Sequence, residues 1–321
     1  MHSQKMTCSD LEDVPCPLCQ SKEADHVLTG RDLINSMPGR FNVIRCKSCN
    51  LMRTNPRPTK TGIADYYPDH YGPYNNTKIK ENPTTSHQYK RFRAGIKNFL
   101  FNSRTTYIPR CKPGRLLEIG CASGSFLHEM ALSGWSVQGI EFSKKAAQEV
   151  EKMGYPVFNG SLERAPQPAS PFDMIVGWMV FEHLHNPVSD LAKLRAWSTP
   201  DTWLVISVPN ASDLQLELFG DSWHDLHLPN HLFHFTPKTL GNVLSASGWK
   251  IHSIHHQRTV NNLIVSLGNL MISKGYRTFG SSLIKLPGRL GKLRYLLHPV
   301  GWILSKFGQT GRMTVWAKIN E

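Results

Sequence analysis

The chain has 321 residues and is strongly basic, with 37 Lys and Arg against 24 Asp and Glu and a formal net charge of +13. This length allows one large or two modest domains with a sizeable core, and 40% hydrophobic residues is ordinary for a soluble globular protein. The first residues lack the apolar run of a signal peptide, and no window of about 18 apolar residues suggests a membrane span. These features argue against secreted and membrane-spanning classes. They predict a cytoplasmic protein that favours anionic partners.

Four of the seven cysteines form two C-x-x-C pairs, Cys16 with Cys19 and Cys46 with Cys49, with 26 residues between the pairs. Each pair places two thiolates on one tight turn, and two such turns complete a tetrahedral zinc site with no open position. The pattern therefore predicts structural zinc. Disulfides and redox C-x-x-C chemistry are the alternatives, but a reducing cytosol disfavours the first and duplication of the motif disfavours the second.

These cysteines define the expected organisation of the first third of the chain. We expect a flexible tail over 1–13 and a zinc-binding module over 14–60, which is too small to fold without its metal. An aromatic and basic linker over 61–112 follows, with a helix predicted over 89–101. Three tyrosines near its start either close over a bound ligand or pack in the core: Tyr66, Tyr67 and Tyr71.

The most informative segment is a glycine turn after a buried strand over 115–119. Gly120 and Gly124 permit backbone conformations that a side chain would block, and helical apolar spacing follows them. The next predicted strand ends in Glu141, 21 residues after Gly120. A strand, a glycine turn, a helix and a second strand with a terminal acid form the nucleoside-binding half of a doubly wound α/β sheet. The acid can accept hydrogen bonds from both hydroxyls of a ribose.

Five further strands complete the predicted sheet, over 155–158, 173–178, 203–208, 249–256 and 313–319. Helices fill most of the gaps, and the last two strands should pair antiparallel at one edge. The gap over 257–312 is unusually long. It contains an apolar segment over 260–272 and a basic-apolar segment over 285–307.

Four ordered segments together resemble class I S-adenosylmethionine-dependent methyltransferases. The E-x-G-x-x-x-G of Glu118, Gly120 and Gly124 resembles their motif I, and Phe172-Asp173 resembles the start of their fourth strand. The E-H-L-x-x-P over 182–187 is similar to one branch of the family, and 204–210 resembles its fifth strand with terminal Pro-Asn. The resemblance covers about 113–256. It implies a Rossmann-like fold with a seven-stranded, mostly parallel sheet over 113–321, next to a zinc-ribbon-like module. The alternative is a nucleotide-binding fold that has lost activity.

The resemblance implies S-adenosylmethionine as the cofactor and a role for each matching residue. Glu118 would orient the amino acid end, the backbone around Gly120 and Gly124 would hold it, and Glu141 would bind the ribose. The acid that usually meets the adenine amino group is replaced by Ser161. The remaining expected cofactor contacts are Ala122, Phe142, Leu162, Glu163 and Trp178, and core packing is the alternative role for Trp178.

Three histidines are the candidates for chemistry, because many acceptors must lose a proton and histidine is the natural base near neutral pH. His183 follows the fourth strand, and an orienting role is its alternative. His231 and His234 precede Thr236-Pro237, which reads as a helix start and resembles the branch's H-x-x-H-F-T-P. A second metal built from these histidines is a further alternative.

The sequence favours a small-molecule or glycoconjugate acceptor of a sugar, cell-surface polysaccharide or natural-product pathway, methylated on oxygen or carbon. An anionic acceptor suits the charge. An RNA methyltransferase that grips nucleic acid through the zinc module is an alternative, although 177–180 lacks the motif usual for base amines. A non-catalytic role at a membrane surface is another, with 285–307 as a basic amphipathic helix after Pro287 and Gly288 that either touches the inner membrane face or packs on its own domain. A lipid-linked glycan acceptor would unite the first and last readings.

Overall fold

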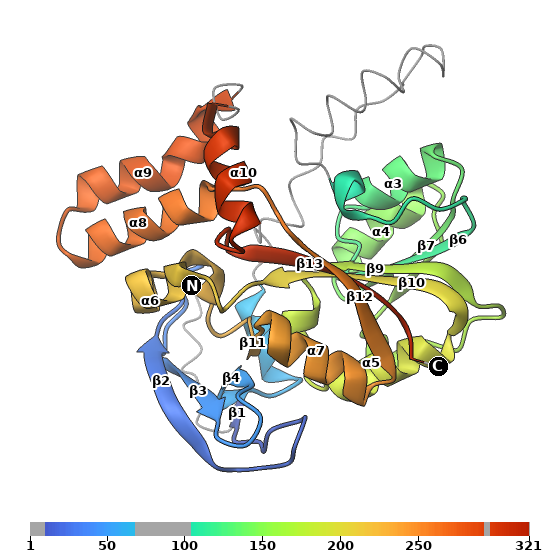
Figure 1. The fold of residues 1–321 in the computed structure, drawn as a ribbon, viewed down its shortest axis with the longest axis horizontal. Coiled ribbons are helices and arrows are strands. Elements are labelled where there is room, and N and C mark those ends of the chain that lie inside the picture. The colour runs from blue at the N-terminus through green and yellow to red at the C-terminus, as the bar shows by residue number, and fades with distance from the viewer. Residues whose placement is uncertain (1–9, 68–103, 292–295, 321) are drawn as a thin grey trace.

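The computed structural model of the protein describes residues 10–67, 104–291 and 296–320 (Figure 1). The predicted helix over 89–101 and Tyr71 lie outside these residues. No helix in the described ranges is long and apolar enough to cross a membrane.

A seven-stranded sheet forms the centre of the larger domain. Its strand order is β12-β13-β10-β9-β6-β7-β8, and β13 alone among these strands runs antiparallel to its neighbours. All seven predicted strands are confirmed, as is the antiparallel pairing of the last two. Strand β10 begins at Ser198, five residues before the predicted start, and the other strand ends shift by at most two residues. The fold class is therefore the expected Rossmann-like methyltransferase fold. The strands are β6 (Arg115–Ile119), β7 (Ser136–Glu141), β8 (Val157–Asn159), β9 (Phe172–Trp178), β10 (Ser198–Pro209), β12 (Trp249–His256) and β13 (Arg312–Ile319).

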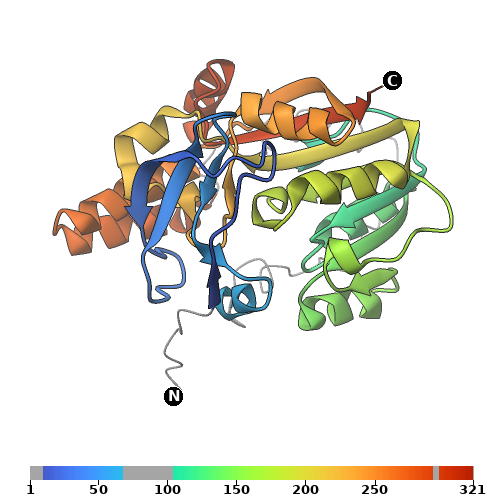
Figure 2. The same cartoon turned by 90° about the horizontal axis from the view of Figure 1, so that it is seen from below.

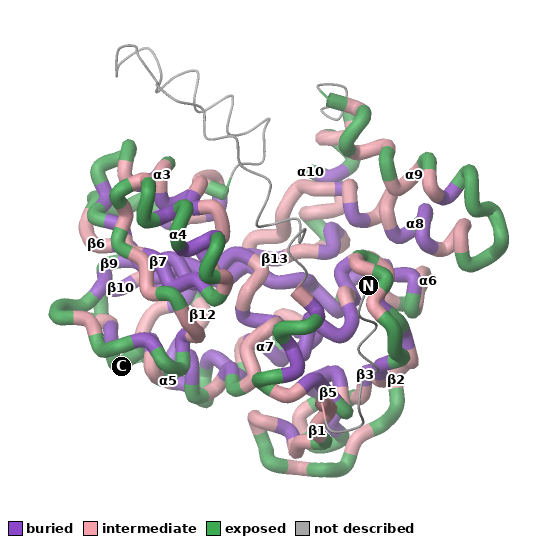
Figure 3. The backbone as a smooth tube through the Cα atoms, turned by 180° about the vertical axis from the view of Figure 1, so that it is seen from behind, coloured by how far each residue is buried: buried purple, intermediate pink, exposed green. Residues whose placement is uncertain are grey.

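Helices cover both faces of this sheet, so its central strands are apolar on both sides. Helices α3 (Ser125–Leu132) and α4 (Lys144–Lys152) lie on one face, and α5 (Pro187–Ala196) and α7 (Pro237–Ala246) lie on the other (Figures 1 and 3). Helix α7 begins as predicted. Its N-cap Thr236 forms a reciprocal capping box with Thr239, and Pro237 occupies the first turn.

The N-terminal module shares a sheet with the larger domain. Strands β2 (Ala24–Gly30), β3 (Phe41–Cys46) and β4 (Met52–Thr54) are antiparallel, and the fourth strand, β11 (Phe233–His234), comes from the segment after β10. The module therefore packs directly against the histidine-rich segment (Figure 2).

A two-residue strand corrects the expected extent of the N-terminal tail. Strand β1 (Leu11–Glu12) pairs antiparallel with β5 (Arg57–Pro58), so residues 11 and 12 are held against the exit of the module. Arg57 strengthens this pairing by donating from Nε to a Glu12 carboxylate oxygen over 2.8 Å. The tail predicted over 1–13 therefore ends before Leu11.

The long insertion is helical and stands off from the sheet. Helices α8 (Asn261–Ser273) and α9 (Arg277–Arg289) form a hairpin, and α10 (His298–Lys306) follows (Figure 1). Gly268 and Gly280 mark the crossing of the hairpin, where a Cβ on Gly280 would lie 2.5 Å from the Gly268 carbonyl oxygen. The expectation that Pro287 and Gly288 precede the helix is wrong, because α9 runs through both. A proline in the last turn removes a single backbone donor, and α9 ends two residues later.

Candidate functional site

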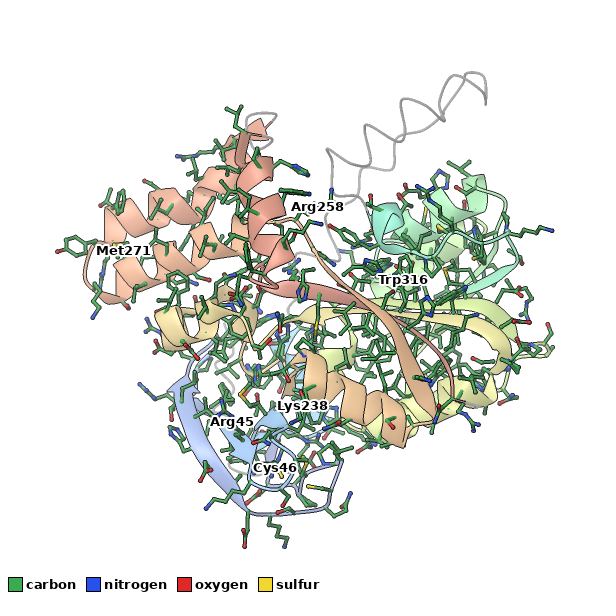
Figure 4. The ribbon with its side chains drawn as sticks, in the orientation of Figure 1. Arg45, Cys46, Lys238, Arg258, Met271 and Trp316 are labelled. Atoms are coloured by element: carbon green, nitrogen blue, oxygen red, sulfur yellow. The ribbon has the colours of Figure 1, made fainter. Side chains whose placement is uncertain are left out.

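The four paired cysteines meet at one point of the N-terminal module, where Figure 4 labels Cys46. Their sulfur atoms all lie within 4.8 Å of one another, and the Sγ atoms of Cys16 and Cys49, and of Cys19 and Cys46, are 3.4 Å apart. All four are free thiols. Four thiolates at about 2.3 Å from a tetrahedral zinc ion lie about 3.8 Å from each other. The spacing therefore fits zinc and does not fit two disulfides.

The two C-x-x-C turns have the same backbone conformation, which explains why both can serve one metal. The residue after each second cysteine is left-handed, with φ of 61° at Gln20 and 63° at Asn50. The amide of that residue donates to the carbonyl of the first cysteine in each turn, over 2.8 Å at Cys16 and 2.9 Å at Cys46. Two matching turns thus present two pairs of thiols to one centre.

A cavity of about 920 Å³ opens at the carboxyl ends of the parallel strands. It is at the upper end of the range of roughly 300–1,000 Å³ typical of small-molecule sites, so it has room for a nucleoside cofactor and an acceptor. One half is lined by the glycine turn, the end of β7 and the turn after β8. The other half is lined by the histidine-rich segment and by residues that leave the zinc module.

The glycine turn is built from three left-handed residues. Gly120 has φ +65° and Gly124 has φ +72°, and a Cβ on Gly120 would lie 2.5 Å from a Val180 methyl carbon. Ala122 has φ 47°, which is costly for a residue with a side chain and is typical of ligand-binding turns. The amides of Gly120 and Cys121 donate to the Ile140 carbonyl. The turn would therefore hold a ligand by its shape and its remaining polar groups, rather than by these amides.

Glu141 fixes the turn against the end of β7. Its carboxylate accepts from the Ala122 amide over 2.8 Å and from the Ser143 amide over 2.7 Å. Burial raises its pKa, and these backbone hydrogen bonds oppose the rise. A carboxylate offers about four lone-pair positions, so the two oxygens retain capacity for ribose hydroxyls on the cavity side.

Glu118 is a buried acid, and one of its carboxyl oxygens makes no hydrogen bond. It is 1% exposed, and its Oε2 has no hydrogen-bond partner. Oε1 lies 3.9 Å from Nη1 of Arg104, a cavity-lining residue that the sequence did not single out. Burial raises the Glu118 pKa to about 8, with Arg104 lowering it and Glu141 raising it further. Glu118 does not line the cavity itself, but it lies two residues before Gly120 and beside Arg104, which both do.

The other predicted cofactor contacts, Phe142, Leu162, Glu163 and Trp178, all line the cavity. Trp178 packs edge-on against Phe126 at a ring separation of 5.3 Å, and its Nε1 has no hydrogen-bond partner. Trp178 therefore packs in the core and also lines the cavity, and its cofactor contact stays a prediction. Glu163 is paired with Lys60 over 2.6 Å, so a residue that follows the four cysteines contacts the turn after β8.

His183 is held in one orientation in the other half of the cavity. Its Nδ1 lies 2.8 Å from the Asn230 carbonyl oxygen and 2.9 Å from the Tyr67 hydroxyl. Because a carbonyl only accepts, Nδ1 carries the proton and Nε2 has the lone pair that a base needs. Burial lowers the His183 pKa to about 4, partly opposed by the Asn230 and Met179 carbonyls. The ring is therefore neutral at pH 7.

His231 lies beside His183 and shares its buried environment. The two ring centroids are 4.7 Å apart, and His231 Nδ1 donates to the Asp225 carbonyl over 2.8 Å. Its Nε2 is 3.8 Å from the carboxyl of Glu182, whose two oxygens have no hydrogen-bond partner. Burial raises the Glu182 pKa to about 8. Ligand atoms of Glu182, His183 and His231 lie within 4.8 Å of one another, a spacing that also suits a cation.

His234 is not a site residue, which corrects the third catalytic prediction. It is buried in β11, its Nε2 lies 3.2 Å from the Thr54 hydroxyl, and it does not line the cavity. Burial lowers its pKa to about 3. The physical reason is strand pairing: β11 turns His234 toward β4, so it joins the module to the domain.

Tyr66 and Tyr67, each expected either to close over a ligand or to pack in the core, lie in different environments. Tyr66 is buried against Phe41, edge to face at 5.8 Å, so it packs in the core. Tyr67 instead lines the cavity and contacts His183. The sequence reasoning missed several cavity residues, among them Arg104, His227 and Arg312. His227 lies in the histidine-rich segment, which was the available signal, whereas Arg104 and Arg312 carried none.

The fold and this cavity define the class of protein. A buried acid beside a glycine turn, a second acid at the end of the next parallel strand and an adjoining histidine pocket are the arrangement of a nucleoside-dependent group transferase of the class I methyltransferase type. A family model described as a methyltransferase domain matches residues 87–254, which is more than half of the chain. The chain belongs to this family.

Individual relatives are more distant. The chain is 27% identical over 175 residues to a malonyl-acyl-carrier protein O-methyltransferase of Halalkalibacterium halodurans, covering 49% of this chain and 57% of that protein. It is 28% identical over 154 residues to a mitochondrial ubiquinone biosynthesis O-methyltransferase of Schizosaccharomyces pombe, covering 44% and 56%. The chain thus spans less than two thirds of the length of these curated relatives.

Among solved structures, the chain resembles an S-adenosylmethionine dependent methyltransferase from Mesorhizobium loti. The TM-score is 0.45 at 15% identity, covering 67% of this chain and 94% of that one. It also resembles the plantazolicin methyltransferase BpumL solved in complex with SAH. There the TM-score is 0.43 at 14% identity, with 82% and 90% covered.

Proposed function

We infer that this protein is an S-adenosylmethionine-dependent methyltransferase of the E-H-L-x-x-P branch that acts on a small-molecule or glycoconjugate acceptor. One observation carries the proposal. One cavity joins the glycine turn at Gly120 and the strand-end acid Glu141 to a neutral, oriented histidine, His183. The buried acid Glu118 does not line this cavity but lies 3.9 Å from Arg104, which does.

The proposed roles follow from the contacts. Glu118 would meet the ammonium of the cofactor and Glu141 its ribose hydroxyls. Ala122, Phe142, Leu162, Glu163 and Trp178 would surround the rest. When bound, S-adenosylmethionine supplies an activated methyl group. His183 would hold the acceptor hydroxyl at Nε2 and take its proton, while Tyr67 and Asn230 keep the ring in place.

Oxygen is the favoured acceptor atom, because both curated relatives named above are O-methyltransferases. The cavity wall carries as many acids as cations, so the choice of a phosphorylated or nucleotide-linked acceptor rests on the net charge of +13 of the whole chain. Arg312 is held by Asp225, with 3.2 Å between Nη2 and Oδ1. An RNA acceptor is the second candidate, and filter binding to total RNA across a salt series tests it. Absent or salt-insensitive binding would remove it.

Cofactor binding should release a proton near neutral pH. Glu118 has a pKa of about 8 without ligand, so it is largely protonated at pH 7. A cation beside it favours the carboxylate, so affinity should rise from about pH 5 to about pH 8. Calorimetry in two buffers of different ionisation enthalpy measures the release. Glu118→Gln should abolish the buffer dependence, and an unchanged dependence would remove the ammonium role of Glu118.

We further propose that Cys16, Cys19, Cys46 and Cys49 hold one structural zinc ion. Cys46→Ser should lose the metal and lower the Tm by about 10 °C or more, because the module folds around the ion. Since β11 pairs with β4, methyl transfer should fall as well. Cys111→Ser is the matched control, because Cys111 is an exposed thiol outside the cluster. Elemental analysis showing full zinc in Cys46→Ser would contradict the assignment.

A further inference from the structure

The insertion over residues 257–311, whose described residues (257–291 and 296–311) form a helical arm, has a charge that differs from that of the rest of the chain. It contains eight Lys and Arg and no Asp or Glu, so it supplies eight of the thirteen net positive charges of the chain. Five of these cations are exposed on the described helices and turns: Lys274, Arg277, Lys285, Arg289 and Lys306. Such a surface attracts an anionic partner and has no acid within the arm to neutralise it.

The same arm exposes large apolar side chains. Eight of the thirteen large hydrophobic side chains that are exposed in the described residues lie on it: Leu267, Tyr276, Phe279, Leu296, Val300, Trp302, Ile303 and Phe307. Phe307 is 73% exposed and Leu296 is 74% exposed. Isolated exposed hydrophobic residues are normal on protein surfaces, but a concentration on one projecting element marks an interaction site.

Helix α10 presents an exposed apolar face. Val300, Ile303 and Phe307 recur at spacings of three and four residues and so lie on one face of the helix. Lys306 lies over the Trp302 ring at 5.4 Å, so a basic and an aromatic side chain flank this face. Apolar residues beside tryptophan and lysine are typical of a helix that lies in a lipid headgroup region.

The arm is fixed to the acceptor half of the cavity through buried polar contacts of α8. Asn262 donates to the Asp225 carboxylate over 2.5 Å, and the His224 amide donates to the Ser266 hydroxyl over 2.9 Å. Asn269 donates to the Ser222 carbonyl over 3.2 Å. His224 and Asp225 line the cavity. Two of the residues that hold α8 in place are therefore also part of the cavity wall, so the arm lies next to the proposed acceptor site.

We propose that the helical arm docks this protein on an anionic phospholipid bilayer, with the apolar face of α10 inserted among the headgroups and the arm's cations paired with lipid phosphates. The exposed cations and the exposed apolar side chains of the arm together identify this partner. A nucleic acid would match the cations but leaves the exposed Val300, Ile303 and Phe307 without a role. Docking does not require methyl transfer, and it places the cavity where a lipid-linked acceptor is available.

The test is flotation of the full-length protein, without cofactor, on vesicles of phosphatidylcholine alone or with abundant phosphatidylglycerol. The wild type should float with the anionic vesicles only. Raising salt from about 0.1 M to about 1 M shortens the Debye length from roughly 10 Å to roughly 3 Å and should weaken this binding. Replacing Lys285, Arg289 and Lys306 by Glu should lower partitioning on the order of a hundredfold. Replacing Trp302, Ile303 and Phe307 by Ser should lower it roughly tenfold or more.

The control carries the same charge change elsewhere. Lys144, Lys145 and Lys238 are exposed outside the arm, and their replacement by Glu should leave flotation nearly unchanged. Unchanged cofactor affinity in the two arm variants verifies their folding. Wild-type protein that stays unbound, that floats equally on both vesicles, or that loses flotation equally in the control would overturn the proposal. RNA binding lost in the arm variants without any flotation would assign the surface to nucleic acid instead.

Discussion

Gly120→Arg is expected to abolish measurable binding of S-adenosylmethionine. The turn requires φ +65° at this position, and a Cβ there would lie 2.5 Å from Val180. Left-handed backbone with a side chain costs roughly 1–2 kcal/mol, and overpacking adds roughly 1–3 kcal/mol. If the turn shifts to relieve this cost, it no longer has the shape that holds the ligand. The affinity should fall on the order of a hundredfold or more, as measured by calorimetry.

Gly154→Arg is the matched control for this variant. Gly154 also has a left-handed backbone, with φ +83°, but nothing lies within 4 Å of a Cβ built on it. The control therefore has the backbone strain without the collision and lies outside the cavity. It should keep wild-type affinity. Glu141→Ala should weaken binding independently, and wild-type affinity in both Gly120→Arg and Glu141→Ala would overturn the site.

His183→Gln is expected to lower kcat by roughly 10²–10⁴-fold while leaving cofactor affinity unchanged. A base must be unprotonated, and the His183 pKa of about 4 keeps it so at neutral pH. Wild-type kcat/KM should therefore rise with pH through about pH 4 and then level off, instead of rising through the usual 6.5. Stopped-time assays across this pH range measure the rise of kcat/KM, and His183→Gln should not show this rise.

Two controls separate base chemistry from positioning and from metal binding. His252→Gln changes an exposed histidine and should retain full activity. Tyr67→Phe removes only the hydroxyl that contacts Nδ1 and should have a small effect on kcat. Full activity in His183→Gln would eliminate the base role. Activity lost to a chelator while zinc remains bound would assign Glu182, His183 and His231 to a cation.

The sheet and the part of the cavity lined by the glycine turn and Glu141 could be predicted because their signals are local. Buried strands, the glycine turn and Glu141 follow one another in sequence, and the carboxyl ends of parallel strands meet at one edge of a sheet. The glycine turn and Glu141 therefore had to meet at the same cavity, with Glu118 buried two residues before Gly120. The meeting of the four cysteines could also be predicted, because two C-x-x-C turns together offer the four ligands of one tetrahedral metal site.

The histidine-lined half of the cavity could be predicted only in part, because it depends on pairing between distant segments. Strand β11 is only two residues long, yet it joins the zinc module and turns His234 away from the cavity. The Thr54 hydroxyl donates to the His231 carbonyl across 177 positions of sequence. Residues such as Arg104 and Arg312 enter the site only through such tertiary contacts and carry no motif of their own.

Transfer of label from methyl-labelled S-adenosylmethionine to fractionated cell extract tests the central claim most directly. The wild-type protein should label a phosphorylated small-molecule or lipid-linked glycan fraction, whereas Gly120→Arg and His183→Gln should not. Label that appears only in RNA, or in no fraction although the protein binds the cofactor, would contradict the account.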